Sequence, residues 1–258
     1  MVKVRIIPTL LWKDLGLVKG IGFNSWRRIG SLLPAIKVFN ARDVDELILN
    51  DISASVFEQP PDFDTLEGVS NESYVPFTVG GGIQSVDDIT KILRYGADKV
   101  SINSSAYTNP TIIEESAKKF GSQCVVASVD VKRSPEGEYF CYSHSGSKNT
   151  NRKVLNWVKE LESRGAGEIL LTSIDRDGTM EGYDLDLISS VTSSVKIPVI
   201  ASGGAGNYQD MVDAILIGKA SAVAAASIFQ FTDQTPAEAK KYLHKAGVPV
   251  RKNFEVGN

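Results

Sequence analysis

Short apolar runs alternate with longer amphipathic stretches along the chain. Eight runs predict buried strands: residues 4–12, 46–51, 75–79, 99–102, 124–130, 168–172, 199–201 and 222–225. The stretches between them predict helices, for example 86–95, 110–120, 154–164, 208–217 and 236–246. Apolar strands that alternate with helices are typical of a parallel sheet covered by helices. Eight such units favour closure into a (β/α)8 barrel, and a doubly wound open sheet is the alternative.

The pattern also repeats within the chain. The segment Pro76-Phe-Thr-Val-Gly-Gly-Gly82 returns as Pro198-Val-Ile-Ala-Ser-Gly-Gly204, an offset of 198 − 76 = 122 residues. The same offset relates further pairs: Glu46 and Glu168, Gly96 and Gly218, and Ser105 and Ser227. Residues 6–13 fall on 125–132 with a slightly shorter offset. Each half of the chain thus carries four strands, which gives eight in all. We therefore predict one TIM barrel over residues 1–258 with a twofold half-barrel repeat.

Composition and charge exclude several classes of function. The chain is 42% hydrophobic and 23% charged, which is typical of a folded domain. Its net charge of −3 does not suggest the basic surface that binds nucleic acid. The apolar run at 6–12 is too short to span a membrane, so we expect a cytoplasmic protein without a membrane partner. The two cysteines and the histidines His144 and His244 lack metal-ligand spacing. No metal or cofactor is therefore predicted.

The carboxyl ends of the strands are where such barrels hold their active sites. Glycine turns follow strands three and seven, and polar or small residues follow strands four and eight. The predicted phosphate-binding residues are Gly81, Gly82, Asn103, Ser104, Gly203, Gly204, Ala226 and Ser227. Glycine lets backbone amides approach an anion, and helix starts favour phosphate. Two such sites predict a substrate phosphorylated at both ends, whereas the simpler interpretation is a pair of tight turns.

Other polar residues stand at the same end. Asp130 ends the fifth strand and can act as a general acid or base, or it can cap the next helix. Asp177, before Gly178, binds substrate or simply makes the turn that Asp-Gly favours. Lys19, in the long loop after strand one, closes over a phosphate or is merely solvated. Thr172, which ends strand six, completes the predicted substrate-binding set with Asp177 and Gly178.

The opposite end of the barrel carries four charges at or near strand starts. They are Arg5, Glu46, Lys99 and Glu168, and Glu46 and Glu168 are counterparts in the repeat. Alternating charges at the base of a barrel can form a closed ring of salt bridges. Taken alone, the pattern favours a role in stabilising the fold, because residues at this end of such barrels usually serve stability.

The motifs together resemble the HisF family, the cyclase subunit of imidazole glycerol phosphate synthase. The run Gly165-Ala-Gly-Glu-Ile-Leu-Leu-Thr-Ser-Ile-Asp-Arg-Asp-Gly-Thr179 is the most specific motif. The others lie at residues 5–7, 18–20, 45–47, 77–83, 97–103, 120–123, 182–184 and 200–206. The resemblance implies a glutaminase (HisH-like) partner, which releases ammonia that passes through the barrel axis to a bis-phosphorylated substrate. It also makes the ring of charges a gate and Asp98 a residue that docks the glutaminase.

The same family implies two catalytic aspartates, at the ends of strands one and five. Asp130 fills the second place, but Leu11 occupies the first, and the repeat also pairs Leu11 with Asp130 because 130 − 11 = 119. Leucine cannot transfer a proton, and losing one partner of an acid–base pair costs about 10²–10⁴-fold in rate. The segment at residues 9–12 is similar to a HisF-like branch that serves amidino-sugar formation in surface-polysaccharide biosynthesis, where a separate ATP-dependent sugar amidotransferase is a further partner.

Three hypotheses follow from this pattern. The first is a synthase subunit that receives ammonia for amidino-sugar formation. The second is a true cyclase of histidine biosynthesis in which the acid–base duties are rearranged. The third is a conduit without catalysis of its own, which activates a glutaminase.

Overall fold

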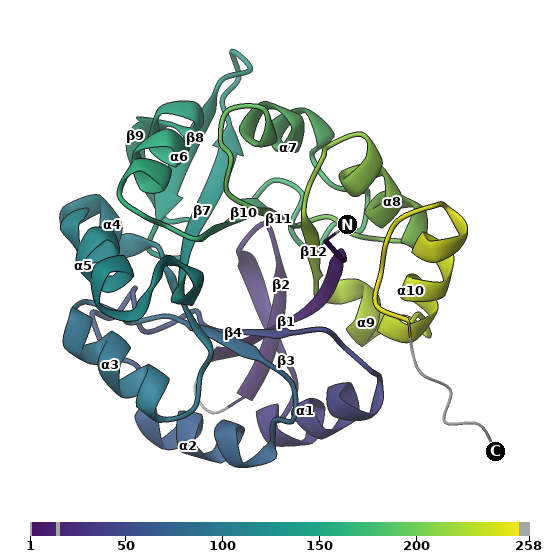
Figure 1. Cartoon of the computed structure of the whole chain (residues 1–258), viewed down its shortest axis with the longest axis horizontal. Coiled ribbons are helices and arrows are strands. Elements are labelled where there is room, and N and C mark those ends of the chain that lie inside the picture. Colours follow the sequence, from purple (N-terminus) through teal and green to yellow (C-terminus); the bar gives the residue numbers. More distant parts are fainter. Residues whose placement is uncertain (1, 14–15, 253–258) are drawn as a thin grey trace.

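Eight parallel strands close into a barrel in the computed structural model, which describes residues 2–13 and 16–252 (Figure 1). The strands are β1 (Arg5–Lys13), β4 (Leu47–Asp51), β5 (Phe77–Gly80), β6 (Lys99–Ile102), β7 (Val125–Arg133), β10 (Glu168–Ser173), β11 (Val199–Ser202) and β12 (Ala222–Ala225). Each pairs with the next, and β12 pairs with β1 to complete the circle. The predicted TIM barrel is confirmed, with strand bounds within two residues of most of those expected.

Helices surround the strands as an outer ring (Figure 1). The longer ones are α1 (Leu32–Ala41), α2 (Phe63–Glu72), α3 (Val86–Arg94), α5 (Thr111–Phe120), α6 (Val154–Ser163), α7 (Leu185–Thr192), α8 (Tyr208–Leu216) and α10 (Pro236–Lys245). Two short helices, α4 (Ser104–Thr108) and α9 (Ser227–Phe231), follow β6 and β12, and a 3-10 turn, η1 (Ser122–Cys124), precedes β7. Helices α3 and α8, repeat counterparts, both begin with a capping box, at Ser85 and at Asn207.

Strand registers reproduce the sequence repeat. Leu47 pairs with Phe77 in one half, and Ile169 pairs with Val199 in the other, so both partners are shifted by 122 residues. At the mouth, Leu11 lies beside Asn50 as Asp130 lies beside Thr172. Leu11 therefore occupies the place of Asp130 in the first half, as the sequence offset predicted.

One predicted correspondence is wrong by a residue. Strands β6 and β12 begin at Lys99 and Ala222, and helices α4 and α9 begin at Ser104 and Ser227. Both differences are 123, because the second half has one extra residue before β12. The counterpart of Ser227 is consequently Ser104, not Ser105.

Two β-hairpins rise from the same end of the barrel. Strands β2 (Gly16–Ile21) and β3 (Asn24–Gly30) extend β1, whereas β8 (Tyr139–Ser143) and β9 (Lys148–Lys153) extend β7. Both hairpins follow equivalent strands, so the twofold repeat includes them. The sequence pattern did not predict either hairpin.

An apolar layer fills the inside of the barrel. Its members come from six of the eight strands and are almost fully buried: Ile7, Ile48, Val126, Leu170, Ile200, Ala222 and Ala224. A second and larger core packs between the strands and the outer helices. The inner layer separates the charges at the base from the polar mouth. Across the described ranges, no helix combines the length and the apolar character that crossing a membrane requires.

Candidate functional site

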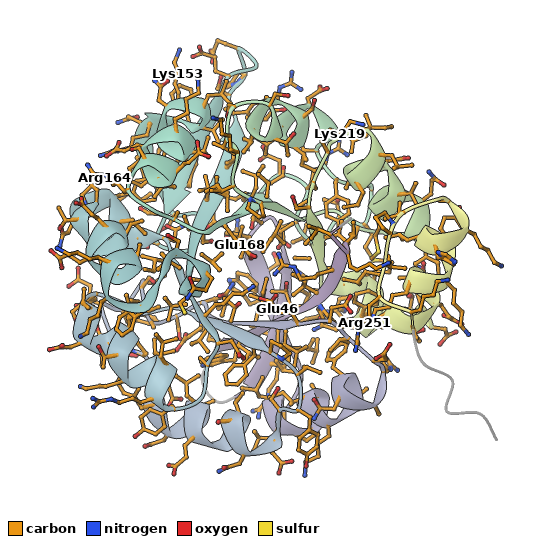
Figure 2. The ribbon with its side chains drawn as sticks, viewed as in Figure 1. Glu46, Lys153, Arg164, Glu168, Lys219 and Arg251 are labelled. Carbon is orange, nitrogen blue, oxygen red and sulfur yellow. The ribbon has the colours of Figure 1, made fainter. Side chains whose placement is uncertain are left out.

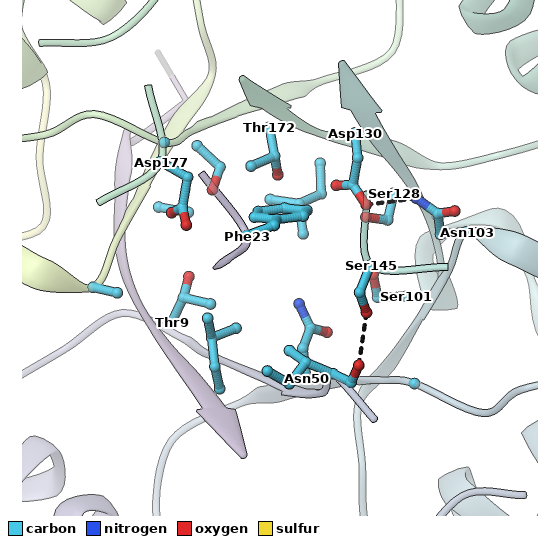
Figure 3. A pocket seen from close by; sticks show the side chains of 18 of the residues that line it. Thr9, Phe23, Asn50, Ser101, Asn103, Ser128, Asp130, Ser145, Thr172 and Asp177 are labelled. Atoms are coloured by element: carbon cyan, nitrogen blue, oxygen red, sulfur yellow. Dashed lines mark hydrogen bonds between the residues drawn. The ribbon is translucent and has the colours of Figure 1, made fainter. Parts of the chain in front are cut away.

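A cavity of about 1110 Å³, which includes space open to solvent, occupies the mouth of the barrel (Figure 3). All of the predicted mouth residues line it: Lys19, Gly81, Gly82, Asn103, Ser104, Asp130, Thr172, Asp177, Gly178, Gly203, Gly204, Ala226 and Ser227. These residues come from both halves of the chain. Closure of the barrel brings together candidates that lie more than 200 residues apart in sequence.

The two glycine turns have matching geometry. Gly81 has a φ of 104°, and a Cβ there would lie 2.3 Å from the carbonyl oxygen of Asp51. Gly203 has a φ of 88°, and its Cβ would lie 2.6 Å from the carbonyl oxygen of Ser173, the repeat counterpart of Asp51. Both positions require glycine for the backbone itself. The tight turn and an anion site are therefore compatible interpretations of the same residues.

Asp130 is held at the mouth by hydrogen bonds. Its Oδ2 accepts from Nδ2 of Asn103 at 2.9 Å (Figure 3). Burial raises the pKa of the Asp130 carboxyl to about 7, the negative charge of Asp177 adds to this rise, and the Thr172 side chain opposes it. Strand β7 continues to Arg133, so Asp130 does not cap a helix. The carboxyl can exchange a proton near neutral pH.

Lys19 differs from the sequence expectation. It lies in strand β2, not in a loop, and only 3% of it is exposed. Its Nζ binds both carboxylate oxygens of Asp177, at 2.9 and 3.1 Å. The prediction that it is solvated is wrong because the β2–β3 hairpin folds over the loop that follows β10. Asp177 also takes part in the turn there, since its amide donates to the carbonyl of Ser173.

The side of the mouth where β12 adjoins β1 lacks the polar pair found where β6 adjoins β7. Leu11 stands where Asp130 does, and Ala226 stands in the place of Asn103, because 226 − 103 = 123. Leu11 is 9% exposed and lines the cavity. A carboxylate on β7 and its amide partner after β6 thus correspond to two apolar side chains, on β1 and after β12.

Sequence reasoning missed several residues that line the cavity. Ser101 and Ser128 each lie two positions before a predicted site residue, Asn103 and Asp130. Alternation along a strand turns every second side chain to the same face, so this spacing was the available signal. Further lining residues are Thr9, Phe23, Trp26, Asn50, Asp51 and Ser145. Phe23 and Trp26 belong to the unpredicted hairpin and carried no such signal.

The predicted ring of charges is present at the base of the barrel, where Figure 2 labels two of its members, Glu46 and Glu168. Arg5 binds Glu46 at 2.7 Å and Glu168 at 2.9 Å, and Lys99 binds the same two carboxylates at 3.0 and 3.3 Å. Thr78 also donates from its hydroxyl to Glu46 at 2.7 Å. The four ion pairs form a closed circuit across the axis. Asp98, next to Lys99, is exposed at this end, and its carboxylate accepts from the amide of Phe77.

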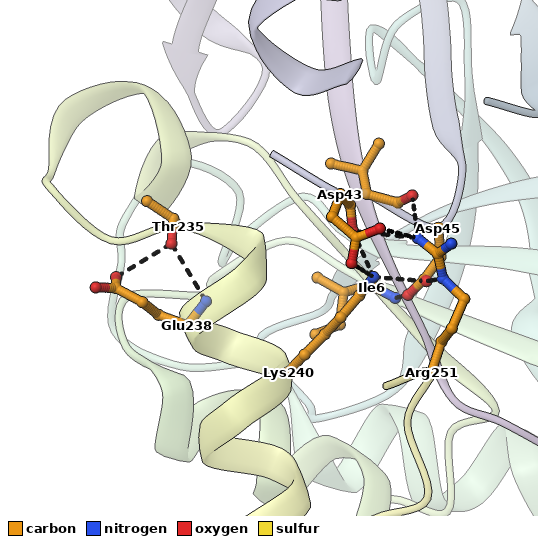
Figure 4. A network of polar contacts seen from close by, with 8 residues as sticks. Ile6, Asp43, Asp45, Thr235, Glu238, Lys240 and Arg251 are labelled. Carbon is orange, nitrogen blue, oxygen red and sulfur yellow. Dashed lines mark hydrogen bonds and ion pairs between the residues drawn. The ribbon is translucent and has the colours of Figure 1, made fainter. Parts of the chain in front are cut away.

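A second polar network lies beside this ring (Figure 4). Lys240 of α10 is 3% exposed and binds Asp45 at 2.8 Å, and Arg251 binds the same carboxylate at 2.9 Å. The other oxygen of Asp45 accepts from the amide of Ile6. Asp45 and Ile6 are sequence neighbours of the ring residues Glu46 and Arg5. The network ties Lys240 and Arg251 to the residues that flank the ring at the base of the barrel.

Among residues 2–13 and 16–252, no three His, Cys, Asp or Glu side chains gather in a way that could hold a metal ion. His144 lies in the turn between β8 and β9, and His244 is exposed on α10.

Comparison with known proteins agrees with this geometry. The family model described as "Histidine biosynthesis protein" matches residues 5–235. This chain belongs to the HisF family. It is 45% identical over 251 residues, 97% of this chain and 100% of the relative, to imidazole glycerol phosphate synthase subunit HisF of Pelodictyon phaeoclathratiforme, and the same values hold for that of Natranaerobius thermophilus. The HisF of Staphylococcus carnosus is 45% identical over 252 residues, 97% of this chain and 99% of the relative.

Proposed function

We propose that this HisF-family synthase subunit receives ammonia at its base from a HisH-like glutaminase and delivers it to a phosphorylated acceptor at its mouth. The arrangement of the barrel supports this route. The charged ring closes one end of the axis, the apolar layer follows, and the cavity opens at the other end. An apolar layer favours neutral ammonia over ammonium, because burying an unpaired charge is costly.

The ring of Arg5, Glu46, Lys99 and Glu168 then acts as the gate. Its salt bridges close the axis in the chain alone, and a docked partner that draws one side chain aside would open it. Asp98 is the proposed docking residue, because it is exposed beside Lys99 at the same end. The names of the relatives, which are subunits of a synthase, also suggest a glutaminase partner.

The mouth would hold the acceptor through two phosphate-binding turns. Gly81 and Gly82 with Ser104 form one turn, and Gly203 and Gly204 with Ser227 form the other. Their backbone amides need no side chain for this role, so Ala226 beside Ser227 is compatible with it. Thr172, Asp177 and Gly178 lie between the two turns on the cavity wall.

One observation decides which acceptor we propose. Leu11 stands where a second acid opposite Asp130 would be, and Ala226 stands where a second amide equivalent to Asn103 would be. We therefore propose an acceptor that needs one proton-transferring group, such as a sugar that gains an amidino group for a surface polysaccharide, with a separate ATP-dependent sugar amidotransferase as a further partner. If Asp130 has no catalytic role, the chain would only conduct ammonia and activate the glutaminase.

Imidazole glycerol phosphate synthase of histidine biosynthesis is the second candidate function. The names of the relatives favour it, and so do the retained Asp130 and both phosphate turns. In this function Asp130 would serve both proton-transfer steps, since Leu11 can serve neither.

One assay separates the candidates. The purified chain is incubated with free ammonium and the histidine-pathway substrate of the synthase, and imidazole glycerol phosphate is followed by absorbance. We expect no product above background, and the chain should fail to rescue a histidine auxotroph that lacks its cyclase. Measurable product would support the second candidate and overturn the first. In the native pathway, Asp130→Asn should abolish formation of the final product. Unchanged product formation would support only the hypothesis of a conduit without catalysis.

A further inference from the structure

Two uncharged polar side chains flank Leu11 at the mouth. Asn50 is its direct neighbour on β4, and Thr9 lies two positions before it on β1, so all three line the cavity. The hydroxyl of Thr9 is buried and has no hydrogen-bond partner in the described part of the chain. The amide nitrogen of Asn50 points into the cavity, and both side chains lie across it from Asp130 and Thr172 (Figure 3).

The backbone beside Asn50 leaves room for its carboxamide. The repeat counterpart of Asn50 is the smaller Thr172, because 172 − 50 = 122. The residue paired with each on the next strand differs in the opposite sense: Asn50 pairs with Gly80, and Thr172 pairs with Ser202. A Cβ on Gly80 would overlap Oδ1 of Asn50. Glycine therefore lets the carboxamide oxygen lie against β5, which turns the amide nitrogen to the cavity.

The cavity wall beside these two residues is apolar. It is lined by Leu11 on β1 and by Ala224 and Ala226, in and just after β12. Their repeat counterparts are all polar: Asp130, Ser101 and Asn103. The charged residue next to Asn50 in sequence is Asp51, and its carboxylate already accepts from the amide and the hydroxyl of Ser53. This side of the mouth therefore offers hydrogen-bond donors without a charge.

Uncharged donors beside apolar side chains define the chemistry that fits this side of the mouth. A carbonyl oxygen accepts hydrogen bonds from an amide and a hydroxyl and needs no cation. A small alkyl group attached to that carbonyl can pack on the apolar wall. A phosphate or carboxylate fits poorly here, because a charged group that loses its hydration without a cation is costly to bury. The combination favours a neutral acyl group, such as the acetyl of an acetamido substituent.

We propose that Thr9 and Asn50 form an acyl-binding subsite: both donate hydrogen bonds to the carbonyl oxygen of a neutral acyl group on the acceptor, and Leu11 contacts its alkyl part. These residues then determine specificity, and Leu11 has a role of its own beyond the loss of an acid. The inference rests on the proposed function in taking the mouth as the acceptor site, with the phosphate held by the glycine turns.

Calorimetric titration of the full chain with N-acetylglucosamine 6-phosphate and with glucose 6-phosphate tests the selectivity. The acetylated probe should bind about 5- to 20-fold more tightly. Asn50→Thr, which copies the residue at the counterpart position, and the isosteric Thr9→Val should each weaken binding of that probe alone by about 3- to 10-fold. Ser202→Ala, on another part of the wall, is the control and should keep the preference. Equal affinities in the unmodified chain, or a preference that persists in Asn50→Thr or in Thr9→Val, would overturn the proposal.

Nitrogen-15 NMR separates this subsite from the phosphate sites. The side-chain amide signal of Asn50, assigned by its loss in Asn50→Thr, should shift with N-acetylglucosamine 6-phosphate and stay in place with glucose 6-phosphate. The backbone amides of Gly81 and Gly203 report the phosphate. If they shift with both probes while the Asn50 signal does not move, the subsite is refuted and the acceptor site stands. If unphosphorylated N-acetylglucosamine shifts the Asn50 signal while neither sugar phosphate shifts the glycine amides, the subsite is supported and the phosphate sites of the proposed function fail.

Discussion

The two halves of the barrel share one backbone and differ in chemistry. Strand registers, glycine turns and capping boxes recur at offsets of 122 or 123 residues. At the mouth, however, the bonded pair Asp130 and Asn103 lies where β7 adjoins β6, whereas the repeat counterparts Leu11 and Ala226, where β1 adjoins β12, are both apolar. Backbone features are constrained by packing in both halves, whereas side chains that face the cavity are constrained only by what the cavity does.

The two halves of the repeat differ less at the base of the barrel than at its mouth. Glu46 and Glu168 are counterparts, and both bind Arg5 and Lys99. Glu46 is the more buried, with 4% of its side chain exposed against 13% for Glu168, and it has the hydroxyl of Thr78 as an extra donor. The comparison therefore predicts unequal energetic roles even where the residue type is kept.

Leu11→Asp is expected to have the largest effect, because it restores the second carboxyl of the mouth. With free ammonium and the histidine-pathway substrate, the unmodified chain should give no imidazole glycerol phosphate above background, and Leu11→Asp should raise formation to about 10²–10⁴-fold over that background. Leu11→Asn, of the same size but without an acid, is the control and should not gain activity. Equal activity of both variants would show that the missing carboxyl at position 11 does not account for the lack of cyclase activity.

Glu46→Gln should destabilise the chain more than Glu168→Gln. Removing a buried partner leaves Arg5 and Lys99 partly unpaired, and we expect a loss of about 2 to 4 kcal/mol of unfolding free energy for Glu46 and about 1 to 2 kcal/mol for Glu168. Urea unfolding measures both. Glu138→Gln, in an exposed pair with Lys153, is the control and should change stability by less than about 0.5 kcal/mol. Equal losses at the two ring positions would contradict the asymmetry of burial.

The glycine turns should respond alike. Gly81→Ala and Gly203→Ala each force a Cβ against a carbonyl at positive φ, and each should cost about 1 to 3 kcal/mol of stability. The control is Gly30→Ala, where a Cβ meets no atom within 4 Å. Thermal unfolding in phosphate buffer gives the measurement. A difference of more than about 1 kcal/mol between the two turns would show that the symmetry is only apparent.

Asp130 should impose a small pH dependence on stability. Its folded pKa of about 7 lies above its ordinary value of 3.8, so its ionisation destabilises the fold progressively as the pH rises from about 4 to about 7. Because the mouth is open to solvent, we expect only about 1 to 2 kcal/mol. Asp130→Asn should remove this loss, so that it is the more stable chain at pH 8. Parallel stability curves for both chains would refute the raised pKa.

Most of the barrel could be predicted from the sequence because its signals are local. Apolar runs located the eight strands, and the offset of 122 located the glycine turns. The hairpins were missed because β3 and β9 are largely exposed and carry no apolar pattern. Lys19 was misplaced because it lies on β2, whose pairing with the exposed strand β3 was not predicted. The Ser105 correspondence failed because a fixed offset cannot detect one inserted residue.

By itself, the sequence determined the eightfold pattern, the twofold repeat and the pairing of Leu11 with Asp130, since these depend on residue types and their spacing along the chain. Only the tertiary structure decided that Lys19 is buried on Asp177, that Asn103 holds Asp130 and that four charges close one ring. Each of these contacts joins residues brought together by barrel closure, and their energies depend on burial and distance, which spacing along the chain does not encode.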